Sequence, residues 1–381
     1  MNRMRLLLIA AAILAVGAIL VPAASARTAP SHSFFHQGAR HIVFVQNDNL
    51  AGNQVVVYKR AADGMLAWKK TYATGGLGGM LTGSVVDHLA SQGSLTYDRR
   101  HALLFAVNAG SNTVSVFTVR GDRLHLVQVL SSGGTFPASV AVHGELVYVL
   151  NALNGGSVQG FVVRHHGLAP IWGSNRALGL DPMATPQFTR TPGQVAFSPD
   201  GRELIVTTKA NTNAVDVFRV RRYGRLSDTP VVNTIAAAVP FAVSFNGAGN
   251  LIVAEAGPNV LASFTLNWNR TITPIVTVPT GQAATCWVTR VGSFFYASNA
   301  GTPSVSGFQS GPGGSLSLLG NTATDPGAVD SAASWGGQYL YVQTGGNGIV
   351  DEFRVNNDGS LTSIGSVTVP NAVGGEGIVA F

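Results

Sequence analysis

The chain has 381 residues, of which 46% are apolar and only 11% charged, and it contains 46 glycines. The apolar content excludes a disordered chain, and the scarcity of charged residues is atypical of coiled coils and helical bundles. The net charge of +6 does not indicate a nucleic-acid surface, because the basic residues are scattered apart from a cluster around one turn, Arg219 to Arg225.

The N-terminus has the three parts of an export signal. Arg3 and Arg5 precede an apolar run from Leu6 to Val21, and Ala24-Ser25-Ala26 follows as a small-residue cleavage site. We therefore expect residues 1–26 to be a signal peptide and 27–40 an N-terminal extension. The mature protein is expected to be secreted or extracytoplasmic, without a membrane span, and monomeric.

An aromatic residue ends an alternating apolar segment seven times along the chain, mostly at intervals of about 45 residues, the length of one propeller blade. Strands and turns precede and follow each aromatic, so each unit is interpreted as four short strands, A to D from the innermost outward. The aromatics, near the end of strand C, are Tyr58, Phe117, Phe161, Phe218, Phe264, Phe308 and Phe353.

These units predict an all-β fold, a seven-bladed β-propeller over residues 41–381 with four antiparallel strands per blade. The first unit begins with a B-type strand, His41 to Gln46, and lacks strand A. The last residues, 377–381, match the A-strand pattern of residues 195–197. The C-terminal strand is therefore expected to complete the first blade and close the ring.

Two long insertions, 75–93 and 174–192, both connect a D strand to the next A strand. In an antiparallel blade, D–A connections and B–C loops lie on the same face of the ring. Long loops on a rigid scaffold often carry function, so we expect the site at the mouth of the channel on this face.

The residue nine positions before the strand-C aromatic ends strand B at that face. Lys209 and Glu255 occupy this place in adjacent blades. They are interpreted either as a salt bridge joining two blades or as catalytic groups, with Glu255 moving a proton and Lys209 holding an anion. Neutral residues near the same strand end in other blades, expected to cap the B–C turn or orient a substrate, are Asn108, Asn151 and Asn299.

The insertions and the strand that follows add further candidates. His88 could titrate near neutral pH, and Arg190 could hold a carboxylate, although both could be solvated surface residues. Gln194 is expected to help to orient a substrate. No histidine pair has convincing ligand spacing, so neither a metal nor another cofactor is expected.

Cys286 and Trp287 are interpreted as packing residues. Alignment of the A strands places Cys286 at a position otherwise occupied by small residues, and Trp287 at a large, inter-blade position. The chain has no second cysteine for an intrachain disulfide. It also lacks a G-x-S-x-G motif.

Three segments, 191–220, 251–266 and 280–301, resemble the lactonase-type seven-bladed propeller family. This family includes bacterial 6-phosphogluconolactonases and fungal carboxymuconate cyclases, and the likeness is greatest to its secreted bacterial branch. Where the phosphogluconolactonases carry a histidine-rich PHPH-like segment, this chain has residues 190–194, RTPGQ, and keeps only the proline. The resemblance implies a pocket for a lactone or carboxylate.

Two functions from different classes follow. The first is a secreted enzyme that hydrolyses or forms a lactone of a small carboxylate or sugar acid, either a lactone hydrolase or a muconate-type cyclase. The second is a non-catalytic extracytoplasmic propeller that binds a carbohydrate, a peptide or a cell-surface partner. Propellers host both kinds of function, so the fold alone does not choose between them.

Overall fold

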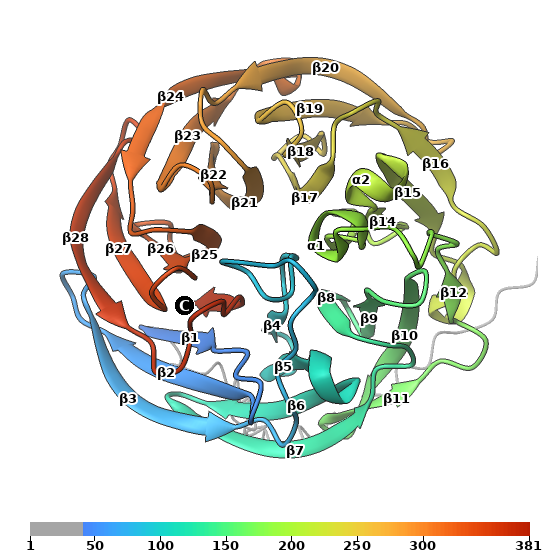
Figure 1. The fold of residues 1–381 in the computed structure, drawn as a ribbon, viewed down its shortest axis with the longest axis horizontal. Coiled ribbons are helices and arrows are strands. Elements are labelled where there is room, and N and C mark those ends of the chain that lie inside the picture. Colours follow the sequence, from blue (N-terminus) through green and yellow to red (C-terminus); the bar gives the residue numbers. More distant parts are fainter. Residues whose placement is uncertain (1–40) are drawn as a thin grey trace, which may run out of the picture. The chain divides into compact units, whose positions relative to one another are not determined.

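Seven antiparallel sheets stand around a central axis in the computed structural model, which describes residues 41–381 (Figure 1). Each sheet is a four-stranded blade, and blade 3 carries one additional short strand. This confirms the predicted seven-bladed propeller. The expected signal peptide and N-terminal extension, 1–40, lie outside the described residues. No helix within residues 41–381 is long and apolar enough to cross a membrane.

The first four blades are built in order from the inner strand outward. Their strands are β29 (Ile378–Ala380), β1 (Ile42–Gln46), β2 (Gln54–Arg60) and β3 (Leu66–Ala73) in blade 1; β4 (Leu95–Asp98), β5 (Leu103–Asn108), β6 (Thr113–Arg120) and β7 (Arg123–Ser131) in blade 2; β8 (Pro137–His143), β9 (Leu146–Asn151), β10 (Ser157–Arg164) and β11 (Gly167–Pro170), with β12 (Arg176–Ala177) also on β10, in blade 3; and β13 (Val195–Phe197), β14 (Glu203–Thr207), β15 (Ala214–Arg219) and β16 (Val231–Thr234) in blade 4.

The last three blades repeat this order, and two short α-helices lie in the loops of blade 4. The strands are β17 (Pro240–Phe245), β18 (Leu251–Glu255), β19 (Val260–Leu266) and β20 (Ile272–Pro279) in blade 5; β21 (Thr285–Val291), β22 (Phe294–Asn299), β23 (Ser304–Ser310) and β24 (Leu316–Ala323) in blade 6; and β25 (Ala328–Ala333), β26 (Tyr339–Thr344), β27 (Ile349–Val355) and β28 (Leu361–Thr368) in blade 7. The helices are α1 (Gln187–Arg190) and α2 (Lys209–Thr212).

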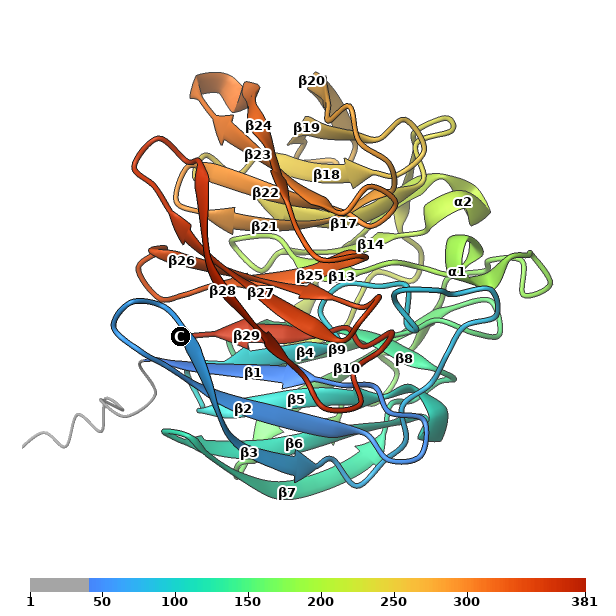
Figure 2. The same cartoon turned by 60° about the vertical axis from the view of Figure 1, so that its left-hand side comes forward.

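The C-terminal strand closes the ring as predicted. Strand β29 lies beside β1 (Figure 2). In this antiparallel pair, Val43 lies opposite Ala380 and Val45 opposite Ile378. Phe381 extends the pairing by donating its backbone N–H to the carbonyl of Ile42, and its ring packs edge-on against Tyr97 of blade 2. Both ends of the described chain therefore complete one blade.

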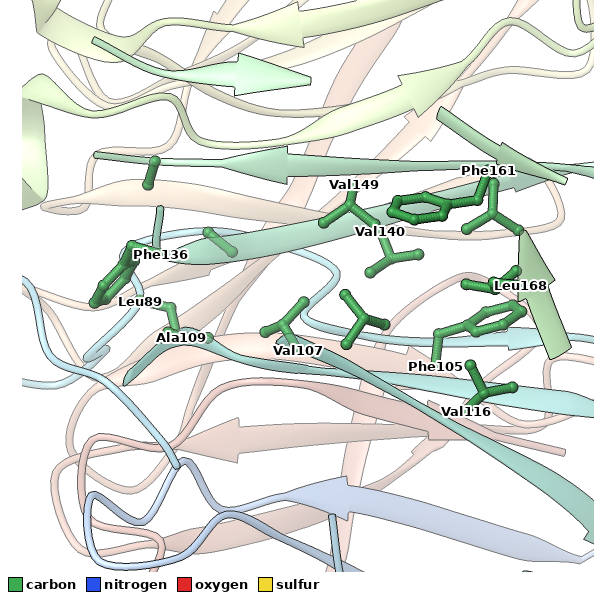
Figure 3. Close-up of a cluster of buried hydrophobic side chains, with 14 of the residues drawn as sticks. Leu89, Phe105, Val107, Ala109, Val116, Phe136, Val140, Val149, Phe161 and Leu168 are labelled. Carbon is green, nitrogen blue, oxygen red and sulfur yellow. The ribbon is translucent and has the colours of Figure 1, made fainter. Parts of the chain in front are cut away.

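The core lies between neighbouring blades, since each sheet buries both faces. Figure 3 shows one such cluster, in which Phe105 and Val107 of blade 2 meet Val149 and Phe161 of blade 3. All seven strand-C aromatics are at most 3% exposed. Their repeat in the sequence is therefore a packing repeat, and the loops at the two faces remain free to carry function.

Candidate functional site

The two long insertions meet on one face of the ring, as the strand alternation predicted. The backbone N–H of Thr82, in the first insertion, donates to Oε1 of Gln187, in the second, over 3.0 Å. Helix α1 belongs to the second insertion and lies beside α2, which follows β14 (Figure 1). The sequence therefore correctly predicted that both insertions lie on the same face of the ring.

These insertions and the neighbouring B–C loops enclose a cleft of about 640 Å³, here called the insertion cleft. Its walls are mainly apolar, with aromatic side chains from the second insertion and from two inner strands. Charged side chains reach it from both insertions and from α2. Its aromatic members are Phe188, Phe241 and Trp287, and its charged members are Asp87, Arg190 and Lys209.

Lys209 is fully buried beside the insertion cleft and joins both insertions to blade 4. Its Nζ donates to the carbonyl oxygens of Ala90 at 2.6 Å and Phe188 at 2.7 Å, and to Oγ1 of Thr191 at 3.1 Å. These acceptors use all three protons of the ammonium. Burial lowers the Lys209 pKa to about 7, against the opposing effect of Asp87. The ammonium therefore holds the loops together and has no proton left to bind a substrate.

The backbone of Lys209 is also unusual. Its φ is +47°, a left-handed conformation that costs free energy in a residue with a Cβ. The hairpin between β14 and β15 is one residue longer than that between β18 and β19, so Thr208, not Lys209, is the structural counterpart of Glu255. The nine-residue count therefore misaligned Lys209 by one position.

Asp87 lies in the first insertion and is 4% exposed. Its Oδ1 accepts from the backbone N–H of Leu89 at 2.8 Å, and its Oδ2 accepts from that of Ser91 at 3.0 Å. Burial raises the Asp87 pKa to about 7, although these N–H groups and the nearby Lys209 charge favour the carboxylate. A carboxyl group with this pKa can gain and lose a proton near neutral pH.

Arg190, at the end of α1, is exposed on the rim of the insertion cleft. One of its guanidinium N–H groups donates to the carbonyl of Ala210 at 2.7 Å. This bond orients the side chain and leaves other N–H groups for a ligand. Arg190 is the predicted site residue whose placement best suits an anion or a polarised carbonyl.

Glu255 is buried at the end of β18 but is not among the residues that line the insertion cleft. Burial raises its pKa to about 7, and its Oε1 has no hydrogen-bond partner among residues 41–381. Lys209 has other partners, so the two charges do not form the inter-blade salt bridge considered from the sequence.

His88 and Gln194 also lie away from the insertion cleft lining. His88 donates its backbone N–H to the carbonyl of Gly374, its ring packs against that glycine, and burial lowers its pKa. Gln194 accepts at Oε1 from the backbone N–H of Val243 at 2.6 Å, which ties blade 4 to blade 5. Both make structural contacts between segments.

The three asparagines close B–C hairpins. Nδ2 of Asn108 donates to Ser115 Oγ at 2.8 Å, and Nδ2 of Asn299 donates to Ser306 Oγ at 2.9 Å. Asn151 makes a longer bond of the same kind to Ser157. All three are fully buried, which agrees with the turn-capping interpretation and leaves their amides turned towards neighbouring strands.

Sequence reasoning missed a cluster of buried acids that adjoins Asp87. The carboxyl group of Glu376 accepts from the backbone N–H of Gly93 at 3.0 Å and is hydrogen-bonded to the Asp330 carboxyl group, and the backbone N–H of Glu376 donates to Asp48 at 2.7 Å. Burial and these mutual charges raise the pKa of Glu376 well above its ordinary value. Among residues 41–381, no three His, Cys, Asp or Glu side chains are arranged to hold a metal ion.

Cys286 and Trp287 are buried between blades, as predicted, but they also line the insertion cleft. Trp287 donates its indole N–H to the carbonyl of Ser91 in the first insertion at 2.6 Å. Burial raises the Cys286 pKa to about 12, so the thiol stays neutral and is a poor nucleophile at pH 7.

Known proteins resemble the chain in structure. A scan against protein-family models and a search of curated proteins gave no match. The periplasmic gluconolactonase PpgL of Pseudomonas aeruginosa superimposes with a TM-score of 0.71 at 17% identity, covering 88% of this chain and 98% of its own. A candidate 6-phosphogluconolactonase of Bacteroides uniformis superimposes with a TM-score of 0.70 at 18% sequence identity. The match covers 87% of this chain and 97% of that one.

A more distant likeness is to virginiamycin B lyase of Staphylococcus aureus, with a TM-score of 0.54 at 10% identity over 76% of this chain and 89% of that one. Identities this low show the fold alone. The resemblance to lactonase-type propellers is thus confirmed for the architecture.

Proposed function

We propose that this chain is an extracytoplasmic lactone hydrolase and that the insertion cleft is its active site. The observation that supports this most is that Asp87 and Arg190 line the same largely apolar cleft. One can take a proton near neutral pH, and the other can hold a developing negative charge.

In the proposed reaction, the Asp87 carboxylate takes a proton from a water molecule as the water oxygen attacks the lactone carbonyl carbon. Arg190 stabilises the resulting oxyanion through its remaining N–H groups. The ring C–O bond then breaks, and protonated Asp87 returns the proton to the departing alkoxide. The product is a hydroxy acid whose new carboxylic acid group loses its proton to solvent, and the resulting carboxylate pairs with Arg190.

The walls of the insertion cleft bear on the substrate class. Phe188, Phe241 and Trp287 offer apolar surface, and the cleft has one exposed cation, Arg190. A sugar phosphate needs several polar partners, whereas a lactone with an alkyl or aromatic body would bury apolar area here. We therefore propose the latter class.

The test is a screen of the protein against aliphatic, sugar and aromatic-derived lactones, in which the release of protons measures hydrolysis. Turnover should be fastest for a lactone with an apolar body. Arg190→Gln should lower kcat/KM by at least about ten-fold, because a charge-assisted hydrogen bond is lost. Arg164→Gln, an exposed arginine in blade 3, should leave it unchanged.

Failure to turn over any lactone would overturn the proposal. Tight binding of an unreacted lactone would then favour the non-catalytic propeller.

A further inference from the structure

A second cleft, of about 920 Å³, is formed between blades 4 and 5 by A–B and C–D turns and is here called the turn cleft. The insertion cleft is formed by B–C and D–A loops, so strand alternation places the two on opposite faces of the ring. They share no lining residue. Its polar and aromatic lining includes Asp200, Arg202, Glu203, Arg219, Trp268 and Arg270.

Trp268 is 92% exposed and stands at the tip of the turn between β19 and β20. Hydrogen bonds hold this turn: the backbone N–H of Asn267 donates to the Thr271 carbonyl at 2.9 Å, and that of Arg270 donates to the Asn267 carbonyl at 2.8 Å. A large indole is thus presented to solvent on a well-braced turn. A preformed aromatic surface loses little conformational entropy on binding.

The opposite wall is equally well braced. Ser198 Oγ lies within hydrogen-bond distance of both carboxylates, 2.7 Å from Asp200 Oδ1 and 3.1 Å from Glu203 Oε2. Arg202 forms an exposed ion pair with Asp200 at 3.5 Å. The acceptors of this wall are therefore fixed before any ligand arrives.

Positive charge exceeds negative charge in the turn cleft, with three arginines against two carboxylates. Arg219 lies opposite Glu203 across the β14–β15 pair, but they form no ion pair within 4 Å. Arg219 is exposed and makes no side-chain hydrogen bond among residues 41–381. The N–H groups of its planar guanidinium can therefore donate two parallel hydrogen bonds to a carboxylate.

We propose that the turn cleft binds an acidic oligosaccharide built of hexuronic acid units. The exposed indole matches the apolar C–H face of a sugar ring, and the mixture of donors and acceptors matches its hydroxyl groups. The uronate carboxylate accounts for the excess of arginine.

The same residues argue against two other anionic partners. The turn cleft has a single exposed aromatic residue, Trp268, which is fewer than the stacking platforms that bind single-stranded nucleic acids use. A lipid surface would need a protruding apolar patch, whereas this site is a concave cleft with polar walls.

The test is calorimetric titration with tetragalacturonate and with neutral cellotetraose. The wild-type protein should bind tetragalacturonate at least about ten-fold more tightly. Trp268→Ala and Arg219→Gln should each weaken that binding by about ten-fold, as for a central contact of an interface. Both residues are exposed, so neither change should disturb the fold.

Matched controls are Trp68→Ala, an exposed tryptophan on β3 of blade 1, and Arg120→Gln, an exposed arginine at the end of β6. Each should leave the affinity within about two-fold. Equal affinity for both sugars, equal losses in the controls, or tighter binding of a dT oligonucleotide or anionic vesicles would overturn the proposal. The lactone hydrolase proposal would stand in each case, because its test uses the other face.

Discussion

Lys209 donates a hydrogen bond of 2.7 Å from its buried ammonium to the backbone carbonyl of Phe188, and so joins α2 to α1. The same nitrogen also binds Ala90 in the other insertion. One side chain therefore fixes the relative position of two loops that lie far apart in the sequence. The wall of the insertion cleft depends on this contact.

Lys209→Met is expected to destabilise the protein by about 3 kcal/mol, since it leaves buried acceptors without a donor and Asp87 without its cation. Denaturant unfolding measures this directly. Hydrogen exchange should increase in both insertions. Lys69→Met is the control, because Lys69 forms only an exposed ion pair with Asp122, and it should change stability by less than about 0.5 kcal/mol. Unchanged exchange in the insertions would contradict the bridging role.

Asp87→Asn should lower the turnover of a reactive lactone by about 100-fold or more, because the proposed general base is lost. With a pKa of about 7, Asp87 is a carboxylate only above neutral pH, so kcat/KM of the wild type should rise with pH through about 7. Glu255→Gln distinguishes the base favoured by the structure from the one the sequence predicts. A loss of activity in Glu255→Gln with full activity in Asp87→Asn would return the role to Glu255.

Stability should fall as the pH rises from 5 to 7. Burial raises the pKa of Asp48 from 3.8 to about 8, so the folded state holds a proton that the unfolded state releases. This contribution is fully present below about pH 4 and is lost as pH rises towards 8. We expect Tm to be roughly 2–4 °C higher at pH 5 than at pH 7. Asp48→Asn should reduce this difference, and an unchanged pH profile in that variant would refute the assignment.

Removal of residues 377–381 should destabilise the ring strongly, since it exposes the edge of β1 and removes buried Ile378 and Phe381. The single change Phe381→Ala should cost about 3 kcal/mol, as for other large core deletions. Thermal and denaturant unfolding of the two variants provide the measurement. A truncated protein with wild-type stability would show that blade 1 does not need its inner strand.

The fold was predictable because every blade repeats one buried aromatic, such as Phe117 in blade 2 and Phe308 in blade 6. The site was less predictable. Counting from Phe218 could not reveal the extra hairpin residue that moves Lys209 out of register. The importance of Asp87 depends on how the first insertion folds back over the ring, which no local pattern indicates.

The cluster of buried acids could not be predicted from the sequence either. Asp48, Asp330 and Glu376 come from three distant segments, and each looks like an ordinary polar residue in its own neighbourhood of the sequence. Only ring closure brings them together. The period of the apolar residues predicts which side chains face the core of a blade. It does not predict which distant segments meet near the centre of the ring.

The pairing of β1 with β29 also imposes an order on biogenesis. The two strands are separated by nearly the whole described chain, so the ribosome finishes six blades before the partner of β1 is made. A blade 1 made of β1, β2 and β3 alone would have an unpaired inner edge, which would be open to mispairing with another chain. The longest-range contact in the ring is thus the last that can form, and its late arrival makes blade 1 the part of the molecule most exposed to misassembly.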